Sequence, residues 1–515
     1  MKKLIKLLIL TTLIVSLVSS FTACSTSDED EEVIINEDGT VDTSKEVKLK
    51  MYLLGDKPKD TDLVYDEINK LLKESINASI EVNFLSWGDW QQKYPLLFAS
   101  GENFDLVYTA NWAQYNQQVS KGAFLEITKD MVDKYAPQTS KSMYEDSWKQ
   151  AQVKGKAYML PMNYKEVQGM VNMYRGDILK KGNIDIPKTL EEESNYYDAC
   201  LEVDGLIPNN VGSDMYWFGV PISLKVDSSW LYFDIGVDNA QYWYDSTDTK
   251  TTKIVDFYKT DEYVESAIIA KEWADKGYWS KSALVNKDPT KDLFLNGRSG
   301  VTGGNLATLN GLYPSVVEAH PEWNVVVADT YYGRAIDMKP YIQNGIAINK
   351  TSKNPERALM ALDLFRNDQK YFDLSFYGIE GKHYKISNNG KNIIPTDESV
   401  NYPPEGACPW GWREDKLVRV IDGGIPNYDE LRNSWLEEAI IHPLQFFSFD
   451  DSKVKNEIAA INNIQKTYGR VIDFGFAKGD VKEAINDYRK KLKSAGRDKV
   501  TEELQRQIDE FLKDQ

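Results

Sequence analysis

The chain has 515 residues, enough for two or three domains, and 42% of them are hydrophobic, enough to bury a large core. Its formal net charge of −18 argues against binding to nucleic acid or to anionic lipid, because both carry negative charge themselves. The sequence lacks the G-x-x-x-x-G-K-[ST] phosphate loop of a transport ATPase. Beyond residue 23 it also lacks an apolar stretch long enough for a permease helix.

The first 24 residues have the layout of an export signal. Lys2, Lys3 and Lys6 form a basic start, residues 7–18 are apolar, and small residues lead up to Cys24. That cysteine resembles the acylated residue of a bacterial lipoprotein signal. The layout predicts that the mature protein begins at Cys24, palmitoylated or otherwise acylated, at the outer face of a Gram-positive-like cell membrane.

A transmembrane anchor is the alternative interpretation of the same segment. Residues 4–23 are only just long enough to span a bilayer, and their flank is wrong for an anchor. Phe21 departs from the leucine that is usual in the lipoprotein motif. We expect a lipoprotein signal peptide over residues 1–23 and, over residues 24–46, an acidic disordered tether that lifts the folded part off the membrane.

The remaining cysteines and the histidines point to no redox or metal chemistry. Cys200 lies in an amphipathic helix pattern, and whether it pairs with Cys408 is left open by the sequence. His320, His383 and His442 stand far apart and lack the spacing of zinc ligands, so we expect no metal and no cofactor.

From residue 47 onward, strands alternate with helices. The hydrophobic patterns predict strands at residues 47–54, 80–84 and 106–108, with helices over 63–76 and 91–99 between them. This βαβαβ order implies a parallel sheet with helices on its faces.

Tryptophans follow two of these strands. In open α/β sheets, ligands bind outside the carboxyl ends of the strands, which is where the loops with Trp87, Trp90 and Trp112 leave the sheet. Asp89 and Asn111 lie in the same loops. Because loops hold binding residues more often than cores do, these rings either face a ligand or pack inside the protein.

The second half continues the alternation and then becomes helical. A strand at residues 171–174 is expected to cross between lobes, and one at 345–349 is expected to return toward the first lobe. Apolar residues at helical spacing predict tail helices near residues 454–468, 481–492 and 501–512.

This order of parts resembles the family 1 extracellular solute-binding proteins of carbohydrate ABC importers. Short stretches along nearly all of the mature chain carry the likeness: residues 86–93, 99–108, 121–125, 155–161, 187–192 and 353–358. Further stretches are similar to the LipO-type branch, whose last domain has no assigned activity: residues 377–384, 447–450 and 491–496.

The resemblance implies an α/β, two-lobed periplasmic-binding-protein-like fold (type II-like) with a hinge and a helical C-terminal tail. We expect the first lobe over residues 47–165 plus 335–370, and the second over 166–334. Residues 371–515 are expected to form the hinge return and a helical C-terminal domain that packs on the second lobe. The implied function is non-enzymatic capture of an oligosaccharide by a monomer, followed by delivery to the transmembrane subunits of an ABC permease.

An oligosaccharide offers C–H faces that stack on aromatic rings and hydroxyls that need donors and acceptors, so its cleft needs both kinds of side chain. The candidates are Trp87, Asp89, Trp90, Asn111, Trp112, Trp217, Trp230, Asn305, Glu380, His383, Trp410, Trp412 and Arg413.

The best single candidate is the loop in which Gly411 separates Trp410 from Trp412. Arg413 follows and could donate two hydrogen bonds to adjacent hydroxyls. The alternative role for this loop is a structural clamp between the tail and a lobe.

The polar candidates also have structural alternatives. Glu380 and His383 are more typical of a polar hinge bonded to its own backbone. Asn305 belongs to a glycine-rich turn at the head of a helix, where backbone N–H groups either meet a ligand or pack in the core.

Two other classes of function compete with sugar capture. A secreted glycoside hydrolase needs two carboxylates across the scissile bond, and 79 acidic residues leave room for such a pair. A binding protein for a peptide, a lipid or a sensory partner would share the two-lobed fold with a different cleft lining.

Overall fold

A computed structural model describes residues 41–167, 169–211, 228–233, 235, 242–330, 333–387, 389–447 and 449–513. The chain divides into two units, Met1–Lys45 and Glu46–Gln515, and the description below concerns the second. The expected signal peptide, Cys24 and Trp217 lie outside the described residues. Within the described ranges, helices long and apolar enough to cross a membrane are absent.

The first lobe is built on a five-stranded sheet in the order β2-β1-β3-β13-β6. Its strands are β1 (Val47–Leu54), β2 (Ala78–Leu85), β3 (Leu106–Thr109), β13 (Gly345–Ile348) and β6 (Leu160–Pro161). The first three are parallel, whereas β13 runs antiparallel to both of its neighbours. β1 and β2 end level with each other, at Leu54 and Leu85, so the loops that follow them leave the sheet at one edge.

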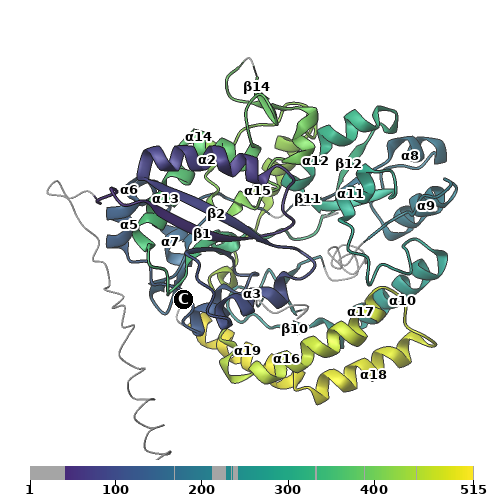
Figure 1. Cartoon of the computed structure of the whole chain (residues 1–515). Coiled ribbons are helices and arrows are strands. Elements are labelled where there is room, and N and C mark those ends of the chain that lie inside the picture. The colour runs from purple at the N-terminus through teal and green to yellow at the C-terminus, as the bar shows by residue number, and fades with distance from the viewer. Residues whose placement is uncertain are drawn as a thin grey trace, which may run out of the picture. The chain divides into compact units, whose positions relative to one another are not determined.

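Helices cover this sheet because each presents one apolar face. In α2 (Thr61–Ile76), Val64, Ile68 and Leu72 are four residues apart and fully buried. Figure 1 shows α2 together with α13 and α14 beside β1 and β2. The other helices of this lobe are α3 (Trp90–Ala99), α4 (Tyr115–Ser120), α5 (Lys129–Tyr135), α6 (Pro137–Ser142), α7 (Glu145–Gln150), α13 (Pro355–Asn367) and α14 (Gln369–Tyr377).

The first lobe extends further along the chain than the expected residues 335–370. Its core also contains Tyr371, Phe376, Tyr402 and Trp412. Residues 371–417 therefore pack mainly with the first lobe, although the sequence assigned them to the hinge return and tail. Small elements of this region are β4 (Gln152–Val153), β5 (Lys156–Ala157), β14 (Tyr384–Ile386), β15 (Ile393–Pro395) and the 3-10 turn η7 (Pro409–Trp412).

The second lobe has an antiparallel sheet in the order β11-β7-β12. Its strands are β7 (Met170–Tyr174), β11 (Val301–Asn305) and β12 (Val326–Asp329). The helices beside it are α8 (Gly176–Gly182), α9 (Leu190–Leu201), α11 (Thr290–Leu295), α12 (Leu306–Ala319) and α15 (Tyr428–Glu438).

A further antiparallel sheet supports the C-terminal helices. It consists of β8 (Trp230–Phe233), β9 (Tyr242–Asp245) and β10 (Val255–Asp256). Its apolar side chains form one hydrophobic cluster with the residues 443–513, which we call the tail. The helices of this part are α10 (Asp261–Lys276), α16 (Lys455–Ile464), α17 (Arg470–Asp473), α18 (Val481–Ser494) and α19 (Arg497–Lys513), and the tail helices are yellow in Figure 1.

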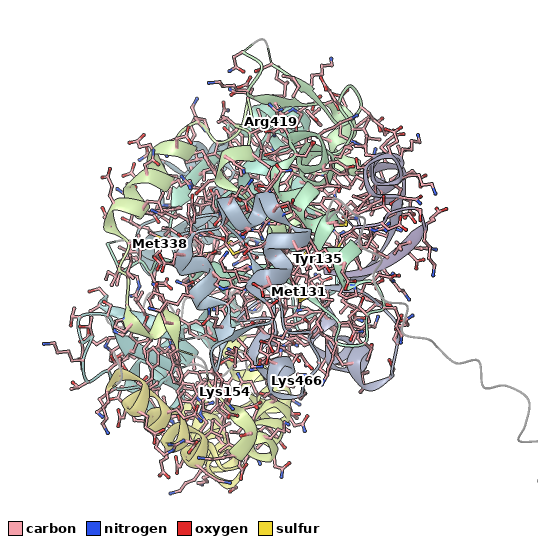
Figure 2. All side chains as sticks on the ribbon, turned by 90° about the vertical axis from the view of Figure 1, so that its left-hand side faces the viewer. Met131, Tyr135, Lys154, Met338, Arg419 and Lys466 are labelled. Carbon is pink, nitrogen blue, oxygen red and sulfur yellow. The ribbon has the colours of Figure 1, made fainter. Side chains whose placement is uncertain are left out.

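The tail also reaches the first lobe. Lys154 Nζ lies 4.0 Å from Asp450 Oδ2, and Figure 2 shows Lys154 beside the tail helices, with Lys466 also labelled there. On the same side, Gln117 Nε2 of the first lobe donates to the carbonyl oxygen of Ile235 at 3.3 Å.

The lobes are joined by stretches near residues 162–167, 336–344 and 417–425. Backbone hydrogen bonds tie the first two of these stretches to each other, as where Lys339 N donates to Glu166 O at 2.8 Å. A hinge therefore lies where all these stretches pass between the lobes.

Cys200 and Cys408 are free, buried thiols in different hydrophobic clusters. Burial raises the pKa of Cys200 to about 12 and raises that of Cys408 as well. Each thiol packs within its own lobe, so Cys200 and Cys408 do not pair with each other.

Candidate functional site

A cavity of about 1500 Å³ is lined by side chains from both lobes, the hinge and the tail. Pockets for drug-sized molecules measure about 300–1,000 Å³, so this one suits a larger ligand. It begins at the edge of the first sheet, where the loops after β1, β2 and β3 emerge, as expected for an open α/β sheet.

Three tryptophan rings form the wall at this edge. Trp87 follows β2, Trp112 follows β3, and Trp410 belongs to η7. The ring centroids of Trp87 and Trp410 are 6.0 Å apart with an interplanar angle of 21°, and those of Trp87 and Trp112 are 6.2 Å apart at 31°. Trp90, largely buried, meets Trp112 edge-on at 5.8 Å. We call Trp87, Trp112 and Trp410 the aromatic wall.

Local backbone features hold the aromatic wall in place. Gly55 ends β1 with φ +111°, and a β-carbon there would stand 3.2 Å from Trp87 Nε1, so the loop needs glycine. Trp112 Nε1 donates to the carbonyl oxygen of Gln343 at 2.8 Å. Gly411 lets η7 pack tightly on β13, because a β-carbon would meet Ile346 Cδ1 at 2.6 Å. Close approach to β13 is thus what this glycine provides.

Two polar groups beside the aromatic wall lack partners. Asn111 Oδ1 is buried and has no hydrogen-bond partner among the residues that the structure describes, although its backbone N–H bonds Ile342 O at 2.9 Å. Arg413 Nε is also buried and has no hydrogen-bond partner among the described residues. Both residues line the cavity. Orphaned buried polar atoms of this kind are rare in folded proteins, and a bound ligand is one way to satisfy them.

The rest of the Arg413 side chain is held firmly. Its Nη2 donates to Glu405 Oε2, its Nη1 lies 3.7 Å from Glu166 Oε2, and its guanidinium carbon is 5.0 Å from the centroid of the Tyr164 ring. Burial raises the pKa of Glu166, and the neighbouring Arg413 opposes this shift. The arrangement keeps a cation at the hinge with one N–H available to a ligand.

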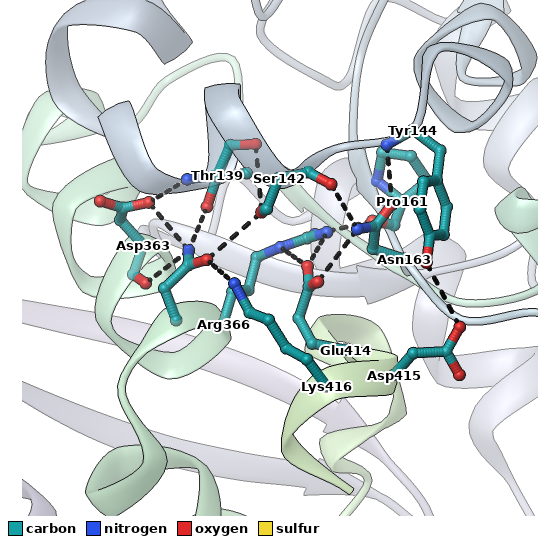
Figure 3. Close-up of polar contacts among 11 residues, drawn as sticks. Thr139, Ser142, Tyr144, Pro161, Asn163, Asp363, Arg366, Glu414, Asp415 and Lys416 are labelled. Carbon is teal, nitrogen blue, oxygen red and sulfur yellow. Dashed lines mark hydrogen bonds and ion pairs between the residues drawn. The ribbon is translucent and has the colours of Figure 1, made fainter.

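A buried polar network lies behind the same segment (Figure 3). Arg366 donates to Glu414 Oε1 through Nε at 3.1 Å and through Nη2 at 2.8 Å, and its Nη1 bonds Pro161 O at 2.7 Å. Asn163 Nδ2 donates to Glu414 Oε2 at 3.0 Å. Asp363 Oδ1 accepts from Thr139 N at 2.6 Å, and hydrogen bonds through Asn367 and Ser142 connect this pair to Asn163. The network fixes the segment that carries Trp410 and Arg413.

Two second-lobe candidates also line the cavity. Trp230 is the first residue of β8 and is half-buried. Asn305 caps α12, where its Oδ1 accepts from Thr308 N at 2.8 Å, so that the side-chain oxygen is already used by the fold.

Four of the candidates that the structure describes do not line the cavity. Trp412 is fully buried and its Nε1 donates to Ser375 Oγ at 3.0 Å, so it packs within the first lobe and makes no clamp to the tail through this bond. His383 is fully buried as well, and Glu380 is exposed. Asp89 accepts from Ser86 Oγ at 2.7 Å and lies 2.6 Å from Lys93 Nζ, and these bonds lower its pKa.

Sequence reasoning missed several cavity residues. Glu166 lies in a hinge stretch without a recognisable motif, and Trp243 was not among the candidates. The tail was not expected to line the cavity at all. The sequence feature that could have revealed this role of the tail is a row of polar residues at helical spacing: Lys455, Asn462, Lys466, Arg470 and Asp473.

The two lobes, the crossing stretches and the cavity at the strand ends define the chain as a two-lobed solute-binding protein. The model of the family described as "Bacterial extracellular solute-binding protein" matches residues 62–369, well over half of the chain, and the chain belongs to that family. A "Domain of unknown function (DUF3502)" matches residues 443–513 of the tail.

Similar proteins span nearly the whole chain. A carbohydrate ABC transporter substrate-binding protein of Streptococcus pneumoniae serotype 4 is 25% identical over 491 residues, 93% of this chain and 94% of that protein. The N-glycan transport solute-binding protein NgtS of Streptococcus pneumoniae, in complex with Man5GlcNAc, has a TM-score of 0.74 at 24% identity, covering 92% of this chain and 99% of that one. The alginate-binding protein AlgQ2 without calcium ion has a TM-score of 0.64 at 18% identity, covering 90% and 98%. The expected two-lobed fold is thereby confirmed.

Proposed function

We propose that this protein is the solute-binding component of an ABC importer, which captures an oligosaccharide in its cavity and delivers it to the permease. Acting as a monomer, it would be held at the outer face of the membrane through acylated Cys24. Loss of membrane retention in Cys24→Ala, with protein released to the medium, tests the anchor.

The aromatic wall and the polar atoms beside it carry this proposal. Trp87, Trp112 and Trp410 offer apolar ring faces of the kind that stack on sugar C–H faces. Asn111 Oδ1 is positioned to accept from a hydroxyl, and Arg413 Nε to donate to one. The similarity over almost the whole chain to a carbohydrate ABC transporter substrate-binding protein supports the same ligand class.

A binding measurement with defined glycans tests the proposal. Isothermal titration calorimetry of the whole mature chain with Man5GlcNAc is expected to show saturable binding of one glycan per protein. The melting temperature is expected to rise with glycan concentration, because stabilisation follows RT ln(1 + [L]/Kd). Alginate oligosaccharides and a set of peptides serve as comparison ligands. If only peptides bind, the proposed ligand class is overturned.

A turnover assay separates capture from hydrolysis. The cavity is lined by several carboxylates, among them Glu166 and Glu405, and a hydrolase would need two acting on one bond. We expect Man5GlcNAc to be recovered intact after prolonged incubation with purified protein. Saturable hydrolysis that copurifies with the protein would replace the proposed function with that of a glycoside hydrolase.

A further inference from the structure

The tail forms part of the cavity wall through one face of a continuous helix. α16, the π-helical turn η11 (Gln465–Gly469) and α17 follow each other without a break. Cavity-lining residues recur along them every three or four positions, the spacing of a single helix face. We call these residues the polar stripe: Lys455, Ala459, Asn462, Lys466, Arg470 and Asp473.

The core-facing side of the same helix fixes where the polar stripe points. Val454, Ile461 and Ile472 are buried in the hydrophobic cluster that the tail shares with β8 and β9. The π-helical turn lies in the middle of the polar stripe, and such turns are frequent at functional sites. The helix is therefore anchored on one side and presents polar groups to the cavity on the other.

Two polar atoms at this part of the wall lack partners. Asn462 Oδ1 is buried without a hydrogen-bond partner among the residues that the structure describes. Trp243 of β9 belongs to the same hydrophobic cluster and is only 9% exposed. Its Nε1 is also buried without a hydrogen-bond partner among the described residues. Both residues line the cavity. Leaving such a group unpaired destabilises the protein, and a bound hydroxyl would offset this cost.

These groups are distinct from the aromatic wall. Trp87 and Trp112 follow strands of the first lobe, whereas the polar stripe belongs to the tail and Trp243 to β9. The chemistry also differs, since the polar stripe carries three cations, two uncharged residues and one carboxylate. A cavity of about 1500 Å³ has room for a ligand that touches both regions.

We propose that the polar stripe and Trp243 form a second sugar subsite, which binds the outer units of a long oligosaccharide while the aromatic wall holds the inner units. A sugar hydroxyl can donate to Asn462 Oδ1, and another can accept from Trp243 Nε1. This inference rests on the proposed function of oligosaccharide capture. It gives the tail, which a domain of unknown function matches, a role in reading ligand length.

A matched pair of asparagine variants tests the subsite. Calorimetry uses the whole mature chain with Man1GlcNAc as the short probe and Man5GlcNAc as the long one. Asn462→Ala is expected to weaken Man5GlcNAc binding about tenfold and to leave Man1GlcNAc binding unchanged, because only the long glycan reaches the tail. Asn463→Ala, at the adjacent exposed position outside the cavity, is expected to bind both glycans like the wild type.

Two further variants keep the test decisive if Asn462→Ala folds poorly. Trp243→Phe keeps an aromatic ring and removes the N–H, and Lys466→Ala changes an exposed side chain of the polar stripe. Both are expected to weaken Man5GlcNAc binding selectively. If folded variants bind both glycans like the wild type, or lose affinity for both equally, the subsite is overturned while oligosaccharide capture stands. If the wild type binds neither glycan, both proposals fail together.

Discussion

The segment of residues 408–416 has a core side and a cavity side, and they differ in whether their polar atoms have partners. On the core side, Trp412 Nε1 bonds Ser375 Oγ, and both carboxylate oxygens of Glu414 accept hydrogen bonds, two of them from Arg366. These groups sit where only the protein itself can supply partners.

On the cavity side, Arg413 Nε and the nearby Asn111 Oδ1 have no partner within the described residues, and Trp410 is half-buried against Trp87 of the aromatic wall. The contrast teaches how to separate stability from binding in this fold. A buried polar atom that is satisfied reports on folding, whereas one that is left unsatisfied beside a cavity reports on a ligand.

The largest expected effect comes from breaking the core side. Glu414→Gln leaves Arg366 buried without its compensating charge, which is expected to cost about 3–5 kcal/mol of unfolding free energy. Urea denaturation monitored by tryptophan fluorescence measures this loss. Lys416→Ala, which removes an exposed bond to Asn367, is the control and is expected to change stability by less than about 0.5 kcal/mol. A Glu414→Gln variant as stable as this control would contradict the comparison.

The two tryptophans on either side of Gly411 allow a reciprocal test. Trp412→Ala is expected to lose about 3–5 kcal/mol of stability, because it empties a fully buried site, and to keep the Man5GlcNAc affinity of the folded protein. Trp410→Ala is expected to lose about 1–3 kcal/mol of glycan binding with a smaller loss of stability. Denaturation and calorimetry on both variants measure the two quantities.

The opposite outcome has a clear meaning. If Trp412→Ala weakens binding at temperatures where it is folded and Trp410→Ala does not, the assignment of the two sides is reversed.

Much of the first half of the first lobe could be predicted from the sequence. Alternating and helical hydrophobic patterns predict β1, α2, β2, α3 and β3 nearly at their observed bounds, because each element buries one regular face. The rule for strand ends in open sheets then brings Trp87 and Trp112 to one edge, where the structure places them.

The rest of the site depends on tertiary packing. Trp410 and Trp412 both stand next to Gly411, so the sequence around them does not tell the two rings apart. The packing of η7 against Ile346 determines which ring faces the cavity. The apolar face expected in the tail does enter the core through Val454, Ile458 and Ile461. Its polar face looks like an ordinary solvated surface in the sequence, because nothing local says that a cavity lies beyond it.

Asp60 is a second case of this limit. Asp60 stands just before α2, where an aspartate often caps a helix, but it makes no cap bond there and instead lies 3.2 Å from His383 Nε2 and 3.1 Å from Lys382 Nζ. The partners are more than 300 residues away, so the pattern around Asp60 could not reveal them.

The smallest expected effect concerns His383, a candidate whose two ring nitrogens both have hydrogen-bond partners within the protein. Its Nδ1 accepts from Ile379 N at 2.9 Å and its Nε2 donates to Asp60, so the ring is neutral in the fold. Burial lowers the pKa of His383 from its ordinary 6.5, despite the opposing effect of Asp60. Below about pH 6.5 the unfolded chain therefore binds a proton that the folded chain does not. Stability should fall on acidification by up to about 1.4 kcal/mol per pH unit.

Denaturation between about pH 7 and pH 5.5 measures how stability depends on pH. His383→Asn is expected to remove the contribution of His383 to this slope and to leave that of the buried His442 unchanged. Asp60 titrates well below this window, because its own pKa is lowered by its bond to His383. If the variant and the wild type lose stability in parallel, His383 is protonated in the folded protein as well as in the unfolded chain. The ring would then carry a charge beside Asp60, and it would no longer belong with Trp412 and Glu414 among the groups that serve folding alone.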